Sequence, residues 1–353
     1  MRVVLADPAA FTPQYDHELA AGLARQGAEV ELVTSRFRFG VAPAPVGYLR
    51  REVFYPASSR LFRRSRVRLP LKVAEHPVGL ARLARSRRDV LHVQWLAAPE
   101  LDAALFRTRG PAVFTAHDLL PRRTAHREDL WRRLLRRFER IVVHSERGLE
   151  TLTALGVDGG RLRVIPHAAF RSDPARSDDG HTVLSLGAIR PYKGLGDAIA
   201  AVARVDGARL LVAGDPLEPL DAYRAAAGSR AEWRVGYLDE AELDRALGDA
   251  TVAVFPYRAE LDQSGALLRA LGAGLPAVVY DVGGLAEPVR AFGAGRVVPP
   301  GDVEGLAEAI RGLLGDEAEL EAARAGARRA RDELTWDRAA AAHIDLYREL
   351  VPD

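Results

Sequence analysis

The stretch Ser185-Leu186-Gly187-Ala188-Ile189-Arg190-Pro191-Tyr192-Lys193-Gly194 is the most informative part of this chain of 353 residues. A short apolar strand is predicted to end at Gly187, where the missing side chain lets the backbone approach a ligand closely. Arg190 and Lys193 follow at the predicted start of the next helix. Because a helix N-terminus and fixed cations both attract anions, these residues predict a diphosphate site. The alternative is a pair of solvated charges on a loop.

Short apolar runs alternate with helical patterns on both sides of this stretch. The expected strands are 3–6, 29–34, 90–94, 113–116, 141–144 and 162–165, then 183–186, 210–213, 233–235, 252–255, 277–280 and 296–298. Strands that alternate with helices are joined by crossover connections, so each series predicts a parallel sheet covered on both faces. The predicted fold class is α/β, with two doubly wound, Rossmann-like domains.

A polar segment separates the two series. Residues 171–181 are rich in Ser, Asp, Pro and Gly and have no apolar periodicity, which is typical of a linker. The predicted organisation is a first domain over residues 1–170, this linker, a second domain over 182–334 and a C-terminal helix over 335–353. Ligands bind outside the carboxyl ends of parallel strands, so a cleft between two such sheets is the expected place for chemistry.

Composition and missing motifs exclude several classes of protein. No run of about 18 uncharged apolar residues exists, so no transmembrane helix is expected, and Asp7 cuts the first apolar stretch too short for a signal peptide. The sequence has no cysteine, which excludes disulfides and thiolate chemistry. Neither G-x-G-x-x-G nor G-x-x-x-x-G-K-[ST] is present, which disfavours nicotinamide dehydrogenases and P-loop enzymes. The expected location is the cytoplasm.

Charge is divided unevenly along the chain. Residues 1–170 hold 29 Lys and Arg against 17 Asp and Glu, whereas the remaining residues hold 21 against 31. A basic half attracts anionic partners, and the basic stretches 60–72 and 127–140 suit the inner face of an anionic membrane, to which the protein would be peripheral. The alternatives are a random asymmetry and, for 127–140, an ordinary buried helix face. Nucleic acid is not an expected partner, because the basic residues lack interleaved aromatic residues.

A second informative stretch covers residues 255–266. Glu260 and Asp262 are expected at the tip of its predicted loop, where a carboxylate can accept hydrogen bonds from sugar hydroxyls; helix N-capping is the alternative. The last three residues of the stretch are predicted to open a helix, so their N–H groups can hold a phosphate or a sugar oxygen. They are Ser264, Gly265 and Ala266.

Together these stretches resemble the retaining glycosyltransferases of the GT-B fold, in particular glycosyltransferase family 4. Members of that family often show a strand followed by G-x-x-R-x-x-K-G, then an acidic loop, a Gly-Leu-Pro strand and G-G-x-x-E. The matching residues here are Gly187, Arg190, Lys193 and Gly194, then Gly274, Leu275 and Pro276, then Gly283, Gly284 and Glu287. Residues 89–95, 114–118 and 164–167 are similar to the same family.

The resemblance implies a hexosyltransferase that moves a sugar from a nucleotide-sugar donor to an acceptor with retention of anomeric configuration. The donor would lie in the second domain, where Arg190 and Lys193 would stabilise the diphosphate as negative charge develops on it. The two side chains would supply the positive charge, so neither a metal nor another cofactor is expected. The acceptor, a glycan, a lipid-linked molecule or a small molecule, would bind the first domain, to which the C-terminal helix is expected to return.

The resemblance also gives roles to the remaining candidates. His117, at the end of a strand, is expected to contact the donor sugar; the alternative is a histidine that orders its own loop through Asp118. Asp262, or Glu260, takes the position of the acid beside that sugar. Tyr15 and Asp16 are expected on the acceptor side, with a plain helix start capped by Asp16 as the alternative. The expected donor-binding residues are Gly187, Glu260, Ser264, Gly265, Ala266, Gly283, Gly284 and Glu287.

One position departs from the family pattern. The family usually carries a second glutamate, near the nucleotide ribose, where this chain has Arg269. An alternative function is therefore a degenerate, non-catalytic GT-B protein that acts as partner or regulator of a related transferase. The nine histidines show neither His-x-His nor His-Glu-x-x-His spacing, so they predict no metal site.

Overall fold

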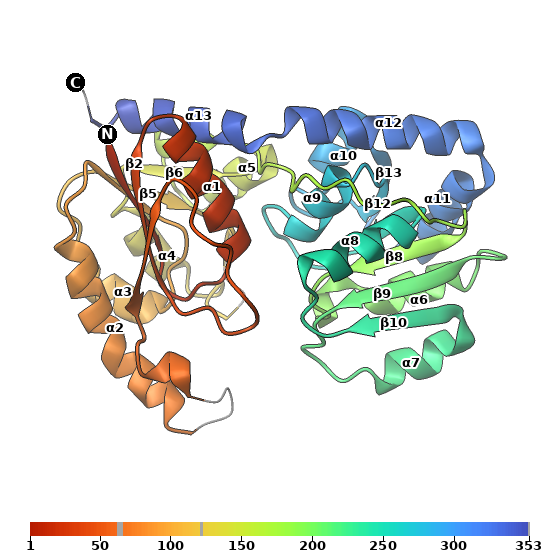
Figure 1. The fold of residues 1–353 in the computed structure, drawn as a ribbon, viewed down its shortest axis with the longest axis horizontal. Helices are drawn as coiled ribbons and strands as arrows, with labels where there is room; N and C mark the ends of the chain where they lie inside the picture. The colour runs from red at the N-terminus through yellow and green to blue at the C-terminus, as the bar shows by residue number, and fades with distance from the viewer. Residues whose placement is uncertain (62–65, 121–122, 352–353) are drawn as a thin grey trace. The chain divides into compact units, whose positions relative to one another are not determined.

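The computed structural model describes residues 1–61, 66–120 and 123–351, and the chain forms two compact units (Figure 1). Unit 1 comprises Met1–Pro166 and Trp336–Asp353, and unit 2 comprises His167–Thr335. Each unit contains one sheet whose strand pairings are all parallel, with helices around it. The predicted α/β class with two Rossmann-like domains is confirmed.

Unit 1 has a sheet of seven strands in the order β3-β2-β1-β4-β5-β6-β7. The strands are β1 Arg2–Asp7, β2 Glu29–Ser35, β3 Leu49–Phe54, β4 Val90–Val93, β5 Ala112–Thr115, β6 Arg140–Val143 and β7 Leu162–Val164. The helices are α1 Pro13–Arg25, α2 Arg68–Ala84, α3 Pro99–Leu105, α4 Glu128–Leu135, α5 Glu146–Ala154 and α13 Trp336–Arg348, with 3-10 turns η1 Ser58–Arg60 and η2 Gly159–Arg161.

Unit 2 has a sheet of six strands in the order β10-β9-β8-β11-β12-β13. The strands are β8 Thr182–Leu186, β9 Arg209–Gly214, β10 Ala231–Val235, β11 Val252–Phe255, β12 Ala277–Tyr280 and β13 Gly295–Val298. The helices are α6 Leu195–Val202, α7 Asp221–Ala227, α8 Glu240–Asp249, α9 Gly265–Gly272, α10 Ala286–Phe292, α11 Val303–Gly315 and α12 Glu317–Glu333, with 3-10 turns η3 Pro191–Lys193 and η4 Gly228–Arg230.

The strand that sequence analysis missed is β3. It lies at the edge of the unit 1 sheet, where its charged residues Arg51 and Glu52 are exposed and only Phe54 is buried. Its pairing with β2 comes from backbone hydrogen bonds, which leave no apolar signal in the sequence. The central strands, by contrast, are buried on both faces and read as continuous apolar runs.

The polar segment 171–181 belongs to unit 2 and is attached to it by backbone contacts. Ser172 N–H donates to Gly272 O at 3.3 Å, and Ser177 N–H donates to Gly248 O at 3.0 Å. A Cβ on Gly248 would lie 2.3 Å from Ala175 O. Small residues on α8 and α9 therefore let this segment lie against the helices, although its own side chains are polar.

The last helix, α13, packs against α1 within unit 1, as expected for a helix that returns to the first domain. Tyr347 OH is 2.6 Å from His92 Nδ1 of β4, and a Cβ on Gly22 would lie 3.0 Å from Ala340 Cβ. His92 is fully buried, and burial lowers its pKa well below the usual value. Across the ranges that the structure describes, no helix combines the length and apolar character needed to cross a membrane.

Candidate functional site

The loop after β8 holds the two cations predicted to bind a diphosphate. Gly187 extends the sheet by donating its N–H to Ala213 O at 2.8 Å, and its φ of 105° lies in the range that favours glycine. Arg190 and Lys193 flank and end the 3-10 turn η3, and α6 begins only after Gly194. They therefore precede the next helix instead of opening it, because Gly194 at φ 69° adopts a left-handed conformation that separates turn from helix.

The ammonium group of Lys193 lies close to the end of β8. A Cβ placed on Gly187 would lie 2.9 Å from Lys193 Nζ and 3.3 Å from Ala266 Cβ. The same Nζ lies 5.1 Å from the centroid of the Tyr257 ring, which is a cation–π distance. The structure thus brings together three predicted residues, Gly187, Lys193 and Ala266, and a side chain at position 187 would crowd the cation.

The side chain of Arg190 is exposed on the same turn. Within the described ranges, its guanidinium forms no ion pair and no hydrogen bond, so its donors are available to a ligand. The nearest acid of the following helix is Asp197, which is already neutralised by Arg258. No carboxylate of the following helix therefore cancels the charge of Arg190.

An ion pair between the buried carboxylate of Asp197 and the exposed guanidinium of Arg258 fixes this turn to the loop after β11. Arg258 Nε donates to Asp197 Oδ2 at 2.9 Å, and this carboxylate raises the pKa of Arg258. Arg258 N–H also donates to Tyr192 O at 2.7 Å, and a Cβ on Gly194 would come within 1.9 Å of Pro256 O. Sequence analysis missed Asp197 and Arg258, because an acid in a first helical turn and an arginine on a loop have no distinguishing spacing.

The two carboxylates of the acidic loop differ in exposure. Glu260 is exposed, but the Asp262 side chain is fully buried, so the expectation that both stand at the loop tip is wrong for Asp262. The reason is that the loop folds back onto the turn after β12. There Gly284 N–H donates to Leu261 O at 3.1 Å, and a Cβ on Gly283 would lie 2.0 Å from the same oxygen. Both glycines therefore serve an internal backbone contact.

The first turn of α9 offers fewer free amides than predicted. Ser264 is the N-cap, and its Oγ accepts from Leu267 N–H at 3.4 Å. Its own N–H donates to Gln263 Oε1 at 2.9 Å, so this amide is not available to a ligand. The amides of Gly265 and Ala266, the first two residues of the helix, are those that an α-helix leaves without an intrahelical partner.

Glu287 is the last of the predicted donor-binding residues in unit 2. It occupies the second position of α10 with a half-buried side chain, and its N–H donates to Gly284 O at 3.4 Å. An acid in a first helical turn is favoured by the positive end of the helix dipole. This effect stabilises α10 whether or not Glu287 also contacts a donor.

Arg269, the departure from the family pattern, is paired with an acid from another helix. Its two terminal nitrogens donate to the two oxygens of Glu240 at 2.8 Å each, and its guanidinium lies 4.8 Å from the Phe170 ring centroid. Glu240 is the first residue of α8, far from position 269 in the sequence. The contact therefore places a carboxylate beside α9 that no gap-free comparison of sequences could reveal.

In unit 1, His117 lies at the end of β5 among aromatic residues. Its Nε2 is 3.0 Å from Gln94 Oε1, and its ring stacks on Trp95 with centroids 5.1 Å apart. Trp95 Nε1 donates to Thr12 Oγ1 at 2.8 Å and contacts the exposed Phe11, at 5.2 Å between centroids. Sequence analysis missed this cluster, because it joins the loops after β1, β4 and β5, which are far apart in the chain.

The two predicted acceptor-side residues are interior. Tyr15 is 4% exposed, with its ring 4.5 Å from that of His117 and 5.0 Å from that of Trp336. Asp16 is 1% exposed and lies inside α1, so it is neither a surface group nor the N-cap. Its carboxyl group shares a hydrogen bond with Asp7, whose oxygens also accept two loop amides. Burial and the neighbouring Asp7 raise the pKa of Asp16 well above the ordinary value.

A second buried chain of polar groups follows β3. Tyr55 OH is 2.7 Å from His76 Nδ1, and His76 Nε2 is 2.7 Å from Asp102 Oδ1. Lys72 Nζ lies 4.6 Å from the Tyr55 ring centroid, and burial lowers the pKa of this lysine. Lys72 and Lys193 are the only lysines in the sequence, and each lies on an aromatic face. Neither the buried polar chain nor the two lysine–aromatic contacts have a spacing that sequence analysis could recognise.

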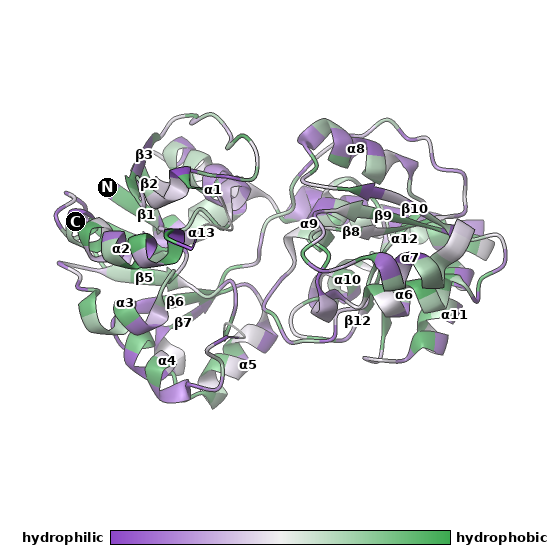
Figure 2. Ribbon diagram, turned by 90° about the horizontal axis from the view of Figure 1, so that it is seen from below, coloured by the Kyte–Doolittle hydropathy of each residue, from purple (hydrophilic) through white to green (hydrophobic). Residues whose placement is uncertain are grey.

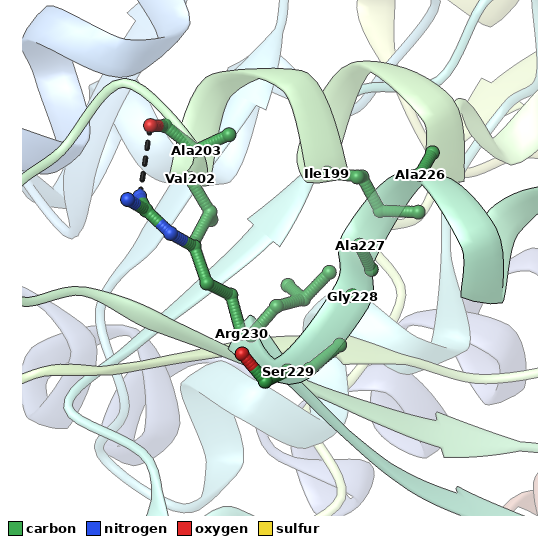
Figure 3. A pocket seen from close by; sticks show the side chains of 10 residues that line it. Ile199, Val202, Ala203, Ala226, Ala227, Gly228, Ser229 and Arg230 are labelled. Carbon is green, nitrogen blue, oxygen red and sulfur yellow. Dashed lines mark hydrogen bonds between the residues drawn. The ribbon is translucent and has the colours of Figure 1, made fainter.

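Two hollows lie away from these loops. One in unit 2, of about 380 Å³, opens at the amino ends of β9 and β10 and is lined by residues of α6, α7 and η4 (Figure 3). Arg230 there donates to Ala203 O at 2.9 Å. This is the edge of the sheet opposite to the one that carries Lys193. No cluster of three or more metal-ligating side chains occurs in the described part of the chain.

Comparisons with known proteins agree on the class of enzyme. The family described as Glycosyl transferases group 1 matches residues 180–316, and the family described as Glycosyltransferase Family 4 matches residues 14–169. No curated protein sequence matches the chain. The two matches are adjacent and each covers most of one unit.

Solved structures share the fold along the whole chain. A sucrose-phosphate synthase from Thermosynechococcus elongatus is 22% identical, with 99% of each chain covered and a TM-score of 0.76. HepE from Anabaena, solved with UDP and glucose, is 16% identical, with 99% and 100% covered and a TM-score of 0.71. WaaG, a glycosyltransferase involved in lipopolysaccharide biosynthesis, is 16% identical with the same coverage and a TM-score of 0.69. From the two family matches and this shared architecture, the chain belongs to the group 1 glycosyltransferases, of family 4 type, with the GT-B fold.

Proposed function

We propose that this glycosyltransferase transfers a hexose from a nucleotide-sugar donor with retention of anomeric configuration, and that Arg190 and Lys193 stabilise the departing diphosphate. The observation that carries the proposal is the cationic turn at the end of β8. Lys193 Nζ lies next to Gly187 and the start of α9, and Arg190 extends from the same turn without a partner among the described residues.

The physical argument is electrostatic. Negative charge develops on the leaving diphosphate as the glycosidic bond to the donor sugar breaks, and cations held in place beforehand stabilise that charge without reorganising. Tyr257 and the Asp197–Arg258 pair hold the turn, so the position of Lys193 does not depend on the ligand. Two such side chains supply charge that a metal ion supplies in other transferases, which supports a metal-independent reaction.

The donor contacts follow from the same edge of the unit 2 sheet. The amides of Gly265 and Ala266, the backbone at Gly187 and the exposed Glu260 are the groups that we assign to phosphate and sugar oxygens. His117 of unit 1, whose Nε2 lies 3.0 Å from Gln94 Oε1, is proposed to contact the donor sugar. We propose Asp262 as a positioning residue for this loop, because it is buried.

Uridine diphosphate sugars are the first donors to test, since the similar HepE is solved with UDP and glucose. The test is a thermal-shift and turnover panel with UDP-, GDP- and ADP-sugars, because a ligand that binds only the native state raises its melting temperature. We expect one nucleotide series to stabilise the protein and its sugar to be released or transferred. A chain that binds a nucleotide sugar but never turns it over, with any acceptor, would instead support the degenerate partner or regulator.

For the acceptor we propose a lipid-linked molecule at an anionic membrane, reached through α2. Six residues of this helix form an exposed apolar face. They are Leu69, Pro70, Val73, Ala74, Pro77 and Val78. Arg66, Arg82 and Arg85 are exposed around it, a combination that suits anionic lipid, and Figure 2 shows hydrophobic and hydrophilic residues mixed along α2.

The other basic stretch does not have this property. The apolar side chains of α4 are 0–4% exposed, which confirms the buried-face alternative for residues 127–140. In the stretch 60–72, Arg63 and Arg64 lie outside the described residues. Sedimentation with phosphatidylglycerol vesicles should therefore fall in Leu69→Asp/Val73→Asp and persist in the control Val235→Asp, which changes an exposed valine of unit 2. Equal sedimentation of both variants would contradict the assignment to α2.

A further inference from the structure

The amino ends of β1, β2, β4 and β5 surround a second hollow, of about 690 Å³, within unit 1. It lies at the edge of the sheet opposite to His117 and Asp7, which follow or end strands at the carboxyl edge. Five of its lining residues are arginines, and the only acids among the lining residues are Glu29 and Asp89. The arginines are Arg2, Arg85, Arg87, Arg88 and Arg109.

Most of this positive charge is uncompensated. The Arg2 guanidinium pairs with Glu29 at 2.9 Å, and Asp89 accepts the backbone N–H of Arg2 at 2.7 Å, so both acids are engaged by one residue. For the other four arginines, the described part of the chain contains no ion pair. Like charges gathered around one hollow repel one another over distances up to the Debye length, about 8 Å at physiological salt. An anion in the hollow would remove that repulsion.

Arg88 carries the most specific signal. Its Nη1 donates to Leu83 O at 2.6 Å and to Ser86 Oγ at 2.6 Å, which fixes the side chain at the end of α2. Its Nε and Nη2 are buried and have no hydrogen-bond partner. These two atoms form the edge of a guanidinium that binds a carboxylate or phosphate through two parallel hydrogen bonds. Burial lowers the pKa of Arg88, because the charged guanidinium is partly removed from water.

We propose that this hollow binds a polyanion with two or more clustered phosphate groups, at a site separate from the donor site. Four guanidinium groups outnumber the charges of a single carboxylate or monophosphate, and the hollow is large enough for several phosphates. Its lining offers few apolar side chains, so charge and planar hydrogen bonding select the ligand. The phosphates can belong to a free polyphosphate or to lipid headgroups, because α2, which bears the exposed apolar face, ends at the lining residue Ala84.

The test uses inorganic tripolyphosphate as the probe and the Lys193→Ala chain as the background, because Lys193 is the proposed diphosphate ligand of unit 2. Titration calorimetry should detect binding, and Arg87→Gln/Arg109→Gln in the same background should weaken it at least tenfold. Both arginines are exposed, so their loss leaves the core unchanged. The control is Arg133→Gln/Arg136→Gln at α4, which removes the same charge from exposed positions outside the hollow. It should change affinity less than twofold.

A parallel arm identifies the source of the phosphates. Sedimentation with phosphatidylglycerol vesicles, against phosphatidylcholine vesicles, is measured for the same two double variants. If only the Arg87/Arg109 variant loses tripolyphosphate binding, the ligand is a free polyanion, and if it selectively loses vesicle binding, the ligand is a headgroup array. If both double variants weaken binding of each probe equally, or if neither probe binds, the hollow is an ordinary basic surface and the proposal fails.

Discussion

The carboxyl edges of the two sheets are built from the same strand–loop–helix units, yet they use their loops differently. In unit 2, Gly187, Gly194 and Gly283 let loops contact one another through their backbones, which leaves Arg190 and Glu260 exposed. In unit 1, the loop after β1 has no glycine, and Asp7 accepts the loop amides instead. A loop held by backbone contacts keeps its side chains for ligands, whereas a loop held by side chains turns them inward.

The interior of unit 1 is correspondingly rich in buried titratable groups. His92, His144 and His343 are buried, and their burial lowers each pKa, to about 4 for His144 and His343. In unit 2, the buried acids near the site are Asp197, which is paired with an arginine, and Asp262. The two units should therefore respond differently to pH and to substitution.

The largest expected effect is acid destabilisation of unit 1. A histidine with a lowered pKa binds fewer protons in the folded than in the unfolded chain, so its contribution is complete above pH 6.5 and is lost as pH falls towards 4. The contributions of His144 and His343 to the free energy of unfolding should each fall by about 3 kcal/mol over this range. Hydrogen exchange at pH 7, 5.5 and 4.5 should show unit 1 opening before unit 2.

The matched variants for this effect are His343→Gln and His181→Gln. The first removes a buried titration in unit 1 and should flatten the fall in stability with pH, whereas the second changes an exposed histidine of unit 2 and should leave it unchanged. Simultaneous opening of both units at every pH would contradict the comparison.

Lys193→Ala should lower kcat by about 10²–10³, the loss typical when one group that stabilises transition-state charge is removed. Arg190→Ala should lower it by a smaller factor, because this side chain is exposed to solvent. Sugar release from the donor that the panel identifies is the readout. Arg245→Ala, an exposed arginine of α8, is the control for charge and should retain the wild-type rate. A wild-type rate in Lys193→Ala would show that the diphosphate is held elsewhere.

Comparing Gly194→Ala with Gly207→Ala separates two effects on stability, that of the contact between loops and that of the left-handed backbone. Both glycines have φ near 70°, but a Cβ on Gly194 meets Pro256 O at 1.9 Å, whereas a Cβ on Gly207 meets nothing within 4 Å. The Gly207 variant should lose about 1 kcal/mol of unfolding free energy for the left-handed backbone alone. The Gly194 variant should lose at least 1–2 kcal/mol more, together with activity. Chemical denaturation measures both, and equal losses would refute the loop contact.

Asp16→Asn should give the smallest effect and the opposite pH trend. The raised pKa means that the folded chain holds a proton that the unfolded chain releases, so the wild-type protein loses stability as pH rises above the ordinary carboxyl range. An amide at this position can donate to Asp7 at every pH, and we expect a gain of about 1–2 kcal/mol at pH 8. Denaturation at pH 5 and 8 tests this, with the exposed Asp206→Asn as the unaffected control.

The outcome of sequence analysis follows the same contrast between the units. Of the thirteen strands in the described residues, β3 alone was missed, because buried strands carry a continuous apolar signal and an edge strand does not. The turn at Arg190 and Lys193 was identified because glycines and cations at fixed spacing describe a local backbone arrangement. Asp262 was expected at a loop tip, and Tyr15 and Asp16 were expected on the acceptor side. All three are buried, because their exposure depends on neighbours that are distant in the chain.

The sequence was sufficient for the two parallel sheets, the cationic turn and the family, since each strand, turn and motif that indicates them is a short continuous stretch of the chain. The tertiary structure alone decided that Glu240 meets Arg269, that Asp7 meets Asp16 and that four arginines without carboxylate partners surround one hollow. These arrangements arise from packing between separate strands and helices, where burial and distance are set by the whole fold. No spacing along the chain encodes them.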